Sequence, residues 1–105
     1  MITKDYLSKF CHDETIILTR HLTLRCSERD LSYDDIKQTI LNGEIVEQYP
    51  DDYPYPSCLI AGFAVDNKHI HVVCGMGEIE LHLITVYYPD IEEWTDDFKI
   101  RKEPK

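Results

Sequence analysis

SCLIAGFAVDNKHIHVVCGMGEIELHLITVYY, residues 57–88, contains three strand patterns in a row, and these decide the fold. Segments 57–65, 69–75 and 79–88 are rich in β-branched and aromatic residues, a composition typical of strands. The connectors between them, DNK and GMGE, are short enough for hairpins. Because short connections join antiparallel neighbours, the stretch predicts three successive antiparallel strands.

Upstream, EIVEQY at residues 44–49 predicts a fourth strand, and the proline-rich PDDYPYP that follows it predicts a loop. Three helix patterns precede this strand. The pattern over 33–42 is the best defined, because Ser32 and Asp35 form an N-terminal capping pair and Gly43 supplies a stop. We therefore expect one α+β domain over residues 1–105, with the N-terminal helices packed on a four-stranded antiparallel meander.

The two ends of the chain carry weaker helix signals. Thr3 is a candidate N-cap for a short helix over KDYLSKFC. At the other end, Asp90 and Glu93 predict a short final helix. Its apolar side chains would fold back on the body: Ile91, Trp94 and Phe98.

Composition favours a cytoplasmic protein. The longest apolar runs fall far short of the ~20 residues that a membrane span needs, and the first residues lack the apolar core of a secretory signal. The four cysteines, Cys11, Cys26, Cys58 and Cys74, form no C-x-x-C pair, so we expect reduced thiols in or near the core.

Charge opposes a nucleic-acid partner over most of the surface. Twenty acidic residues against eleven basic ones give a net charge of −9. Between residues 44 and 97, Lys68 is the only basic residue. Positive charge is concentrated in residues 20–29 and in the tail KIRKEPK, so RNA would have to bind at those two places.

A basic stripe runs along the helix predicted for RHLTLRCSERD, residues 20–30. His21, Arg25 and Arg29 follow one another at intervals of four residues, and the neutral polar residues lie on another side of the helix. The stripe is therefore expected to turn toward the interior or a cleft. An inward arginine needs a partner, which is either a carboxylate of this chain or an anionic ligand.

Two further patterns concern the strands. HIHVV places His69 and His71 on one face, but no third ligand stands beside them, so we predict neither a metal nor a cofactor. In the last strand, simple alternation puts Thr85 and Tyr87 on the same face as Leu81 and Leu83. Either Tyr87 or Tyr88 is expected to be a core aromatic with its hydroxyl at the edge.

The chain resembles the family called domain of unknown function 4258 over roughly residues 15–101. The resemblance rests on the motifs RHLTLRCSERDLSYDDI, GEIVEQYPDDYPYPSCLIAG, HIHVV and LITVYYPDIEEW, in that order. One position departs from the family pattern: members usually have glycine after the second arginine, and here it is Asp30. The family name implies no settled activity.

At the level of fold, helices followed by an antiparallel meander are similar to RelE/barnase-type small ribonuclease toxins. This likeness implies a toxin–antitoxin component with an antitoxin-like protein partner and metal-independent cleavage of RNA. His71 would then be the general base or acid, His21 or Tyr87 its counterpart and Thr85 a positioning hydroxyl, while Arg25 and Arg29 would clamp the phosphate.

The alternative comes from a different functional class. It is a non-catalytic protein-interaction module, in which the loop YPDDYPYPS and an acidic sheet contact a basic partner. Whether the chain is an enzyme stays open at this stage, as does its oligomeric state. If Arg25 faces a carboxylate of this chain, the stripe is structural, whereas an open pocket beside His71 would make it an anion site.

Overall fold

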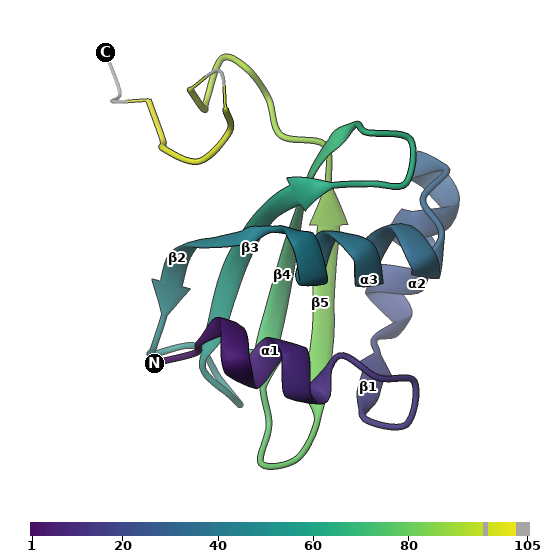
Figure 1. Ribbon diagram of the computed structural model, residues 1–105, viewed down its shortest axis with the longest axis vertical. Helices are drawn as coiled ribbons and strands as arrows, with labels where there is room; N and C mark the ends of the chain where they lie inside the picture. Colours follow the sequence, from purple (N-terminus) through teal and green to yellow (C-terminus); the bar gives the residue numbers. More distant parts are fainter. Residues whose placement is uncertain (96, 103–105) are drawn as a thin grey trace.

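The computed structural model describes residues 1–95 and 97–102. It is an α+β fold in which the helices precede most of the sheet (Figure 1). The helices are α1 (Lys4–Phe10), α2 (Arg20–Arg29) and α3 (Tyr33–Asn42). The strands are β1 (Ile16–Leu18), β2 (Glu44–Tyr49), β3 (Ser57–Phe63), β4 (His69–Met76) and β5 (Leu81–Tyr87).

The strands form one mixed sheet in the order β1-β5-β4-β3-β2. The antiparallel meander β2–β5 confirms the four predicted strands. The prediction of a purely antiparallel sheet is wrong, because β1 pairs in parallel with β5 and adds a fifth strand. A strand of three residues is too short to show the period of two that identifies strands in a sequence.

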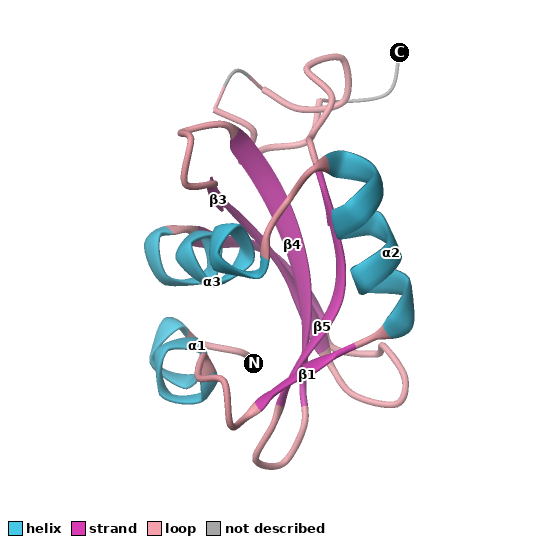
Figure 2. Cartoon of the chain, turned by 90° about the vertical axis from the view of Figure 1, so that its right-hand side faces the viewer, coloured by secondary structure: helices cyan, strands magenta, loops and turns pink. Residues whose placement is uncertain are grey.

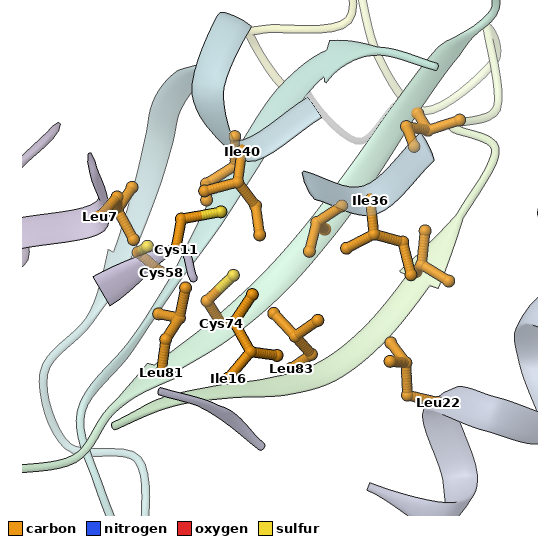
Figure 3. Close-up of a cluster of buried hydrophobic side chains, with 14 of the residues drawn as sticks. Leu7, Cys11, Ile16, Leu22, Ile36, Ile40, Cys58, Cys74, Leu81 and Leu83 are labelled. Atoms are coloured by element: carbon orange, nitrogen blue, oxygen red, sulfur yellow. The ribbon is translucent and has the colours of Figure 1, made fainter. Parts of the chain in front are cut away.

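The sheet has two unlike faces. Helices α1 and α3 lie on one side, and α2 lies beside β5 at the sheet edge (Figure 2). The side chains between helices and sheet form the main core (Figure 3). Its centre consists of fully buried aliphatic side chains from α1, α2, α3 and the strands: Leu7, Leu22, Ile36, Ile40, Ile60, Ile70, Val72, Leu81 and Leu83.

The helix ends follow the sequence signals closely. Ser32 and Asp35 form the predicted capping box of α3, and Thr3 accepts a hydrogen bond from the Tyr6 amide at the start of α1. Gly43 ends α3 with an ordinary φ of −85°. Its lack of a side chain matters for another reason, since an added Cβ would lie 2.6 Å from the Ala61 carbonyl oxygen of β3.

Asp30 ends α2 in the left-handed conformation, with φ 55° and ψ 44°. The Leu31 amide then donates to the Cys26 carbonyl over 2.9 Å, which closes the helix. This conformation favours glycine, because a Cβ crowds the following carbonyl. Helix α2 therefore ends in the backbone conformation that is typical of a C-terminal glycine, although the residue is Asp30.

We expect Asp30→Gly to raise the free energy of unfolding by up to about 1 kcal/mol, because it removes this strain. Asp34→Gly is the matched control. It removes another exposed acid, but from the first turn of α3. Because glycine is unfavourable in a helix, this variant should lower the free energy of unfolding by about 1 kcal/mol. Urea unfolding of both variants checks the prediction, and a loss of stability in Asp30→Gly would contradict it.

A β-bulge changes which faces the side chains of β5 occupy. Thr85 pairs with Val73 and Leu83 pairs with Cys74, so Ile84 is an extra residue in the ladder. Leu81, Leu83 and Val86 therefore lie in the core, while Thr85 and Tyr87 lie on the face without helices. The predicted common face for Leu81, Leu83, Thr85 and Tyr87 is wrong for this reason.

The chain after β5 folds back on the body without forming a helix in its described residues. Residues 91–94 form a hydrogen-bonded turn, and Trp94 and Arg101 form an isolated antiparallel bridge. Trp94 is buried as predicted, but Ile91 is exposed. Phe98 has a φ of 59°, which is unusual for an aromatic residue and incompatible with a helix.

All four cysteines are free thiols, as predicted, and three of them lie in the core. Burial raises the pKa of the Cys58 thiol to about 12, so this thiol stays protonated. Within the described part of the chain, no helix combines the length and apolar character needed to cross a membrane.

Candidate functional site

The basic stripe lies on α2 at the sheet edge. His21 is exposed, and Arg25 and Arg29 are half-buried. Arg25 Nη1 lies 3.0 Å from Glu28 Oε2, and its Nε donates to His21 Nε2 over 3.4 Å. The acceptor of Arg25 is therefore a carboxylate of its own helix. Such a partly exposed i,i+3 pair contributes little stability and does not join the helix to the sheet.

Arg29 is held differently. Its backbone carbonyl accepts a hydrogen bond from the Tyr88 hydroxyl over 3.2 Å, which ties the end of α2 to the end of β5. Its Nη1 is buried and has no hydrogen-bond partner among residues 1–95 and 97–102. Of the two predicted phosphate ligands, only Arg29 thus has a buried donor that the described chain leaves unsatisfied.

His71, Thr85 and Tyr87 share the face of the sheet without helices, because His71 pairs with Tyr87 and Val73 with Thr85. His71 is fully buried there. Its Nδ1 lies 3.3 Å from the Tyr87 hydroxyl, and its Nε2 lies 2.7 Å from the Phe98 carbonyl oxygen. The indole of Trp94 packs edge-on with ring centroids 4.5 Å apart. Both ring nitrogens therefore have partners.

These partners fix the protons of the imidazole. A carbonyl only accepts, so Nε2 carries the hydrogen, and a neutral ring then accepts from Tyr87 at Nδ1. Burial lowers the pKa of His71, and nearby Arg101 adds to the effect, against opposing contributions from the Phe98 carbonyl and Glu47. Burial also raises the pKa of Tyr87. The pair is thus neutral near pH 7.

This neutral His71 predicts a pH dependence of stability. Because its pKa is lower in the folded state, the unfolded chain takes up a proton first as the pH falls below about 6.5. The stability linked to His71 is complete above that pH and is lost as the pH falls toward the folded-state pKa. In urea unfolding, the stability difference between wild type and His71→Gln should shrink between pH 7.5 and 5.5. Parallel curves would contradict this assignment.

A second set of contacts beside His71 was not predicted. Arg101 donates to both carboxylate oxygens of Glu47, over 2.7 and 3.2 Å, and lies over the Trp94 ring at 4.6 Å. Burial would raise the pKa of Glu47, but hydrogen bonds from Arg101 and Tyr49 lower it overall. The tail KIRKEPK was one of the two places where RNA would have to bind. No sequence pattern indicates that Arg101 would pair with β2.

The structure does not join the two halves of the predicted catalytic set. Among the described residues, the side-chain hydrogen bonds of His21 and Arg25 stay on α2, whereas those of His71 join it to Tyr87 of β5 and to the Phe98 carbonyl. His69 stacks between the rings of Phe63 and Phe98, at centroid distances of 4.5 and 4.7 Å. His71 and Tyr87 are in contact, and so are His21 and Arg25, but as separate pairs.

An acidic surface lies at one end of the sheet, where two loops meet. We call residues 50–56 and 77–80 the acidic loop surface. The Pro56 carbonyl accepts from the Met76 amide over 2.8 Å, and the rings of Tyr55 and His82 lie 5.0 Å apart, so the two loops adjoin. Tyr53 is 95% exposed. The loops contribute four acids and no Lys or Arg: Asp51, Asp52, Glu78 and Glu80.

Within the described residues, no three His, Cys, Asp or Glu side chains are grouped closely enough to hold a metal ion. A cavity of about 150 Å³ lies between α2 and α3. Its lining is almost wholly apolar: Leu18, Leu22, Thr23, Cys26, Tyr33 and Ile36. The cavity thus contains none of the predicted catalytic groups.

Comparison with known proteins identifies the family to which the chain belongs. The model of the family described as Domain of unknown function (DUF4258) matches residues 18–88, which run from the end of β1 to just beyond β5. No curated protein and no solved structure matches the chain. The matched region includes both pairs of candidate residues and the acidic loop surface, and it ends before the C-terminal segment.

Proposed function

This chain belongs to the DUF4258 family, and we propose that it is a protein-interaction module of the cytoplasm that binds a basic partner through the acidic loop surface. One observation carries the proposal: two loops that are distant in sequence form a single surface with four acids, three of them exposed, and no Lys or Arg. An exposed tyrosine beside carboxylates suits a lysine- and arginine-rich segment, by cation–π contact and ion pairing. The four free thiols are in keeping with a reducing compartment.

The predicted catalytic residues give a second reason to prefer binding. His71 is sealed under Trp94 and Phe98, and both of its nitrogens are occupied. A general base must reach the proton that it removes, and His71 is closed to substrate in this arrangement. Arg25 is likewise already paired with Glu28.

The test measures binding of a fluorescently labelled lysine- and arginine-rich peptide at low salt, by anisotropy. The variant Asp51→Asn/Tyr53→Ala/Glu78→Gln should lose at least about tenfold in affinity, the size expected for a truncated interface anchor. The matched control Asp34→Asn/Asp66→Asn/Tyr88→Ala alters two acids and a tyrosine at the other end of the sheet and should bind like wild type. Equal losses in both variants would show nonspecific attraction and refute the proposal.

A ribonuclease of the toxin–antitoxin class, with a RelE/barnase-like fold, is the second candidate. Two observations favour it: the contact between His71 and Tyr87, and the buried Nη1 of Arg29 without a partner in the described chain. The net charge of −9 weighs against attraction of RNA. Its test is expression of the protein alone in bacteria. New RNA ends that disappear with Arg25→Ala/His71→Ala would support the enzyme, provided that the variant stays folded.

A further inference from the structure

The cavity between α2 and α3 (Figure 2) has a volume of about 150 Å³ and belongs neither to the acidic loop surface nor to the predicted catalytic residues. Its inner wall contains Leu22 of α2 and Ile36 of α3, which are both buried. Leu18 is 48% exposed and Thr23 is also exposed, so solvent reaches the cavity on their side. Protein interiors are close-packed and contain few voids larger than a water molecule, so a space of this size suits an occupant.

The hydroxyl donors at the cavity wall are already used. The Thr23 hydroxyl donates to the Thr19 carbonyl over 3.2 Å, and the Tyr33 hydroxyl donates to Asp13 Oδ1 over 3.0 Å. The remaining polar side chain of the wall is Cys26, whose thiol is only a weak donor. A water molecule held in a cavity needs about two to four polar partners. An apolar occupant therefore suits this wall better than water does.

The electrostatics of the cavity favour an uncharged occupant. The side chains that line it in the described chain carry no charge. Burial raises the pKa of the Cys26 thiol, Asp35 raises it further, and Arg29 opposes both, so the thiol is neutral near pH 7. The two nearby charges thus have opposite signs and act against each other. An ion would lose its hydration in this cavity without gaining a charged partner in the wall.

We propose that the cavity between α2 and α3 is a binding site for a small, uncharged, apolar molecule of about the size of a benzene ring. An engineered cavity of similar volume, lined by Leu, Ile and Phe, stays dry and binds benzene. The molecule enters past Leu18 and Thr23 and contacts Leu22, Cys26 and Ile36. Because it binds the folded chain and contacts both helices, it stabilises the fold. This site is separate from the acidic loop surface and does not depend on the function proposed above.

The test follows the methyl signals of Leu18, Leu22 and Ile36 by NMR while toluene is added to the full chain. Toluene is an uncharged probe with a single aromatic ring. We expect these signals to shift in a saturable way, together with a rise in the melting temperature of the protein. Benzoate and benzylamine carry the same ring with a negative or a positive charge near pH 7. At the same concentration, they should leave the signals unchanged.

Two variants fill the cavity. Cys26→Phe and Cys26→Leu place a larger side chain inside it and should weaken toluene binding at least about tenfold. Leu24→Phe is the matched control, because it adds the same ring to α2 at a position where the leucine is 56% exposed, and it should bind toluene like wild type. Circular dichroism checks that each variant is folded. Cys26→Leu is the smaller change and decides the test if Cys26→Phe does not fold.

Three results would overturn the proposal. The first is a set of toluene shifts that do not saturate. The second is toluene binding that persists unchanged in the folded Cys26 variants. The third is benzoate binding as tight as that of toluene, which would indicate an anion site beside Arg29 instead of an apolar one.

Discussion

Gly43→Ala is expected to lower the free energy of unfolding by about 3 kcal/mol, because an added methyl group has no room at the end of α3. Its Cβ would lie 2.5 Å from the Thr39 carbonyl oxygen and 2.6 Å from that of Ala61. Both atoms belong to backbone, of α3 and β3, so relief requires the helix and the sheet to separate.

Gly75→Ala is the control for this prediction. Its nearest atom would be Ile84 Cδ1 at 3.3 Å, the tip of a flexible side chain. We expect a change within about 1 kcal/mol. Urea unfolding of both variants measures the difference. If Gly43→Ala is as stable as wild type, α3 and β3 do not approach as closely as the structure has them.

Leu83→Ala is expected to lower the free energy of unfolding by about 2 to 5 kcal/mol. Leu83 is fully buried on β5, beside the bulge that turns Thr85 and Tyr87 to the other face. Its removal leaves a cavity in the main core. For a domain whose total stability is about 5–15 kcal/mol, this is a large fraction.

The control is Leu24→Ala on α2, where the leucine is 56% exposed. It should change stability by no more than about 0.5 kcal/mol. Thermal or urea unfolding distinguishes the two. Equal effects would mean that the register of β5 is wrong, and with it the assignment of His71 and Tyr87 to the helix-free face.

Local signals in the sequence were enough to predict most elements of the fold. The bounds of helix α3, predicted as about 33–42, are confirmed, because Ser32, Asp35 and Gly43 mark its ends by direct hydrogen bonds and sterics. Strands β2–β5 followed from composition and short connectors. Strand β1 was missed because its three residues are too few for a period, and its pairing with β5 is long-range.

The candidate site was less predictable, for two physical reasons. The bulge at Ile84 depends on pairing with β4, which alternation in a single strand does not reveal. The face that holds His71 is closed by Trp94 and Arg101, and Arg101 contacts Glu47, which lies 54 residues earlier in the chain. The sequence indicated that Trp94 would fold back, but not onto which face.

The charges of α2 illustrate the same limit. Helical spacing predicted that His21, Arg25 and Arg29 turn inward. Arg25 and Arg29 are half-buried, but His21 is exposed, so the prediction is wrong for His21. Spacing could not identify the acceptors of the two arginines. The structure gives Arg25 a carboxylate on its own helix, Glu28, which was one of the two alternatives left open. The carboxylate is three residues away, so the pair does not clamp α2 to the sheet.

The most direct test of the proposed function is an NMR map of the amide shifts caused by the lysine- and arginine-rich peptide. The account predicts that shifts concentrate in residues 50–56 and 77–80, weaken as salt is added, and spare α2 and the surroundings of His71. Shifts centred on Arg25, Arg29 and His71, or shifts spread evenly over all acidic residues, would contradict it.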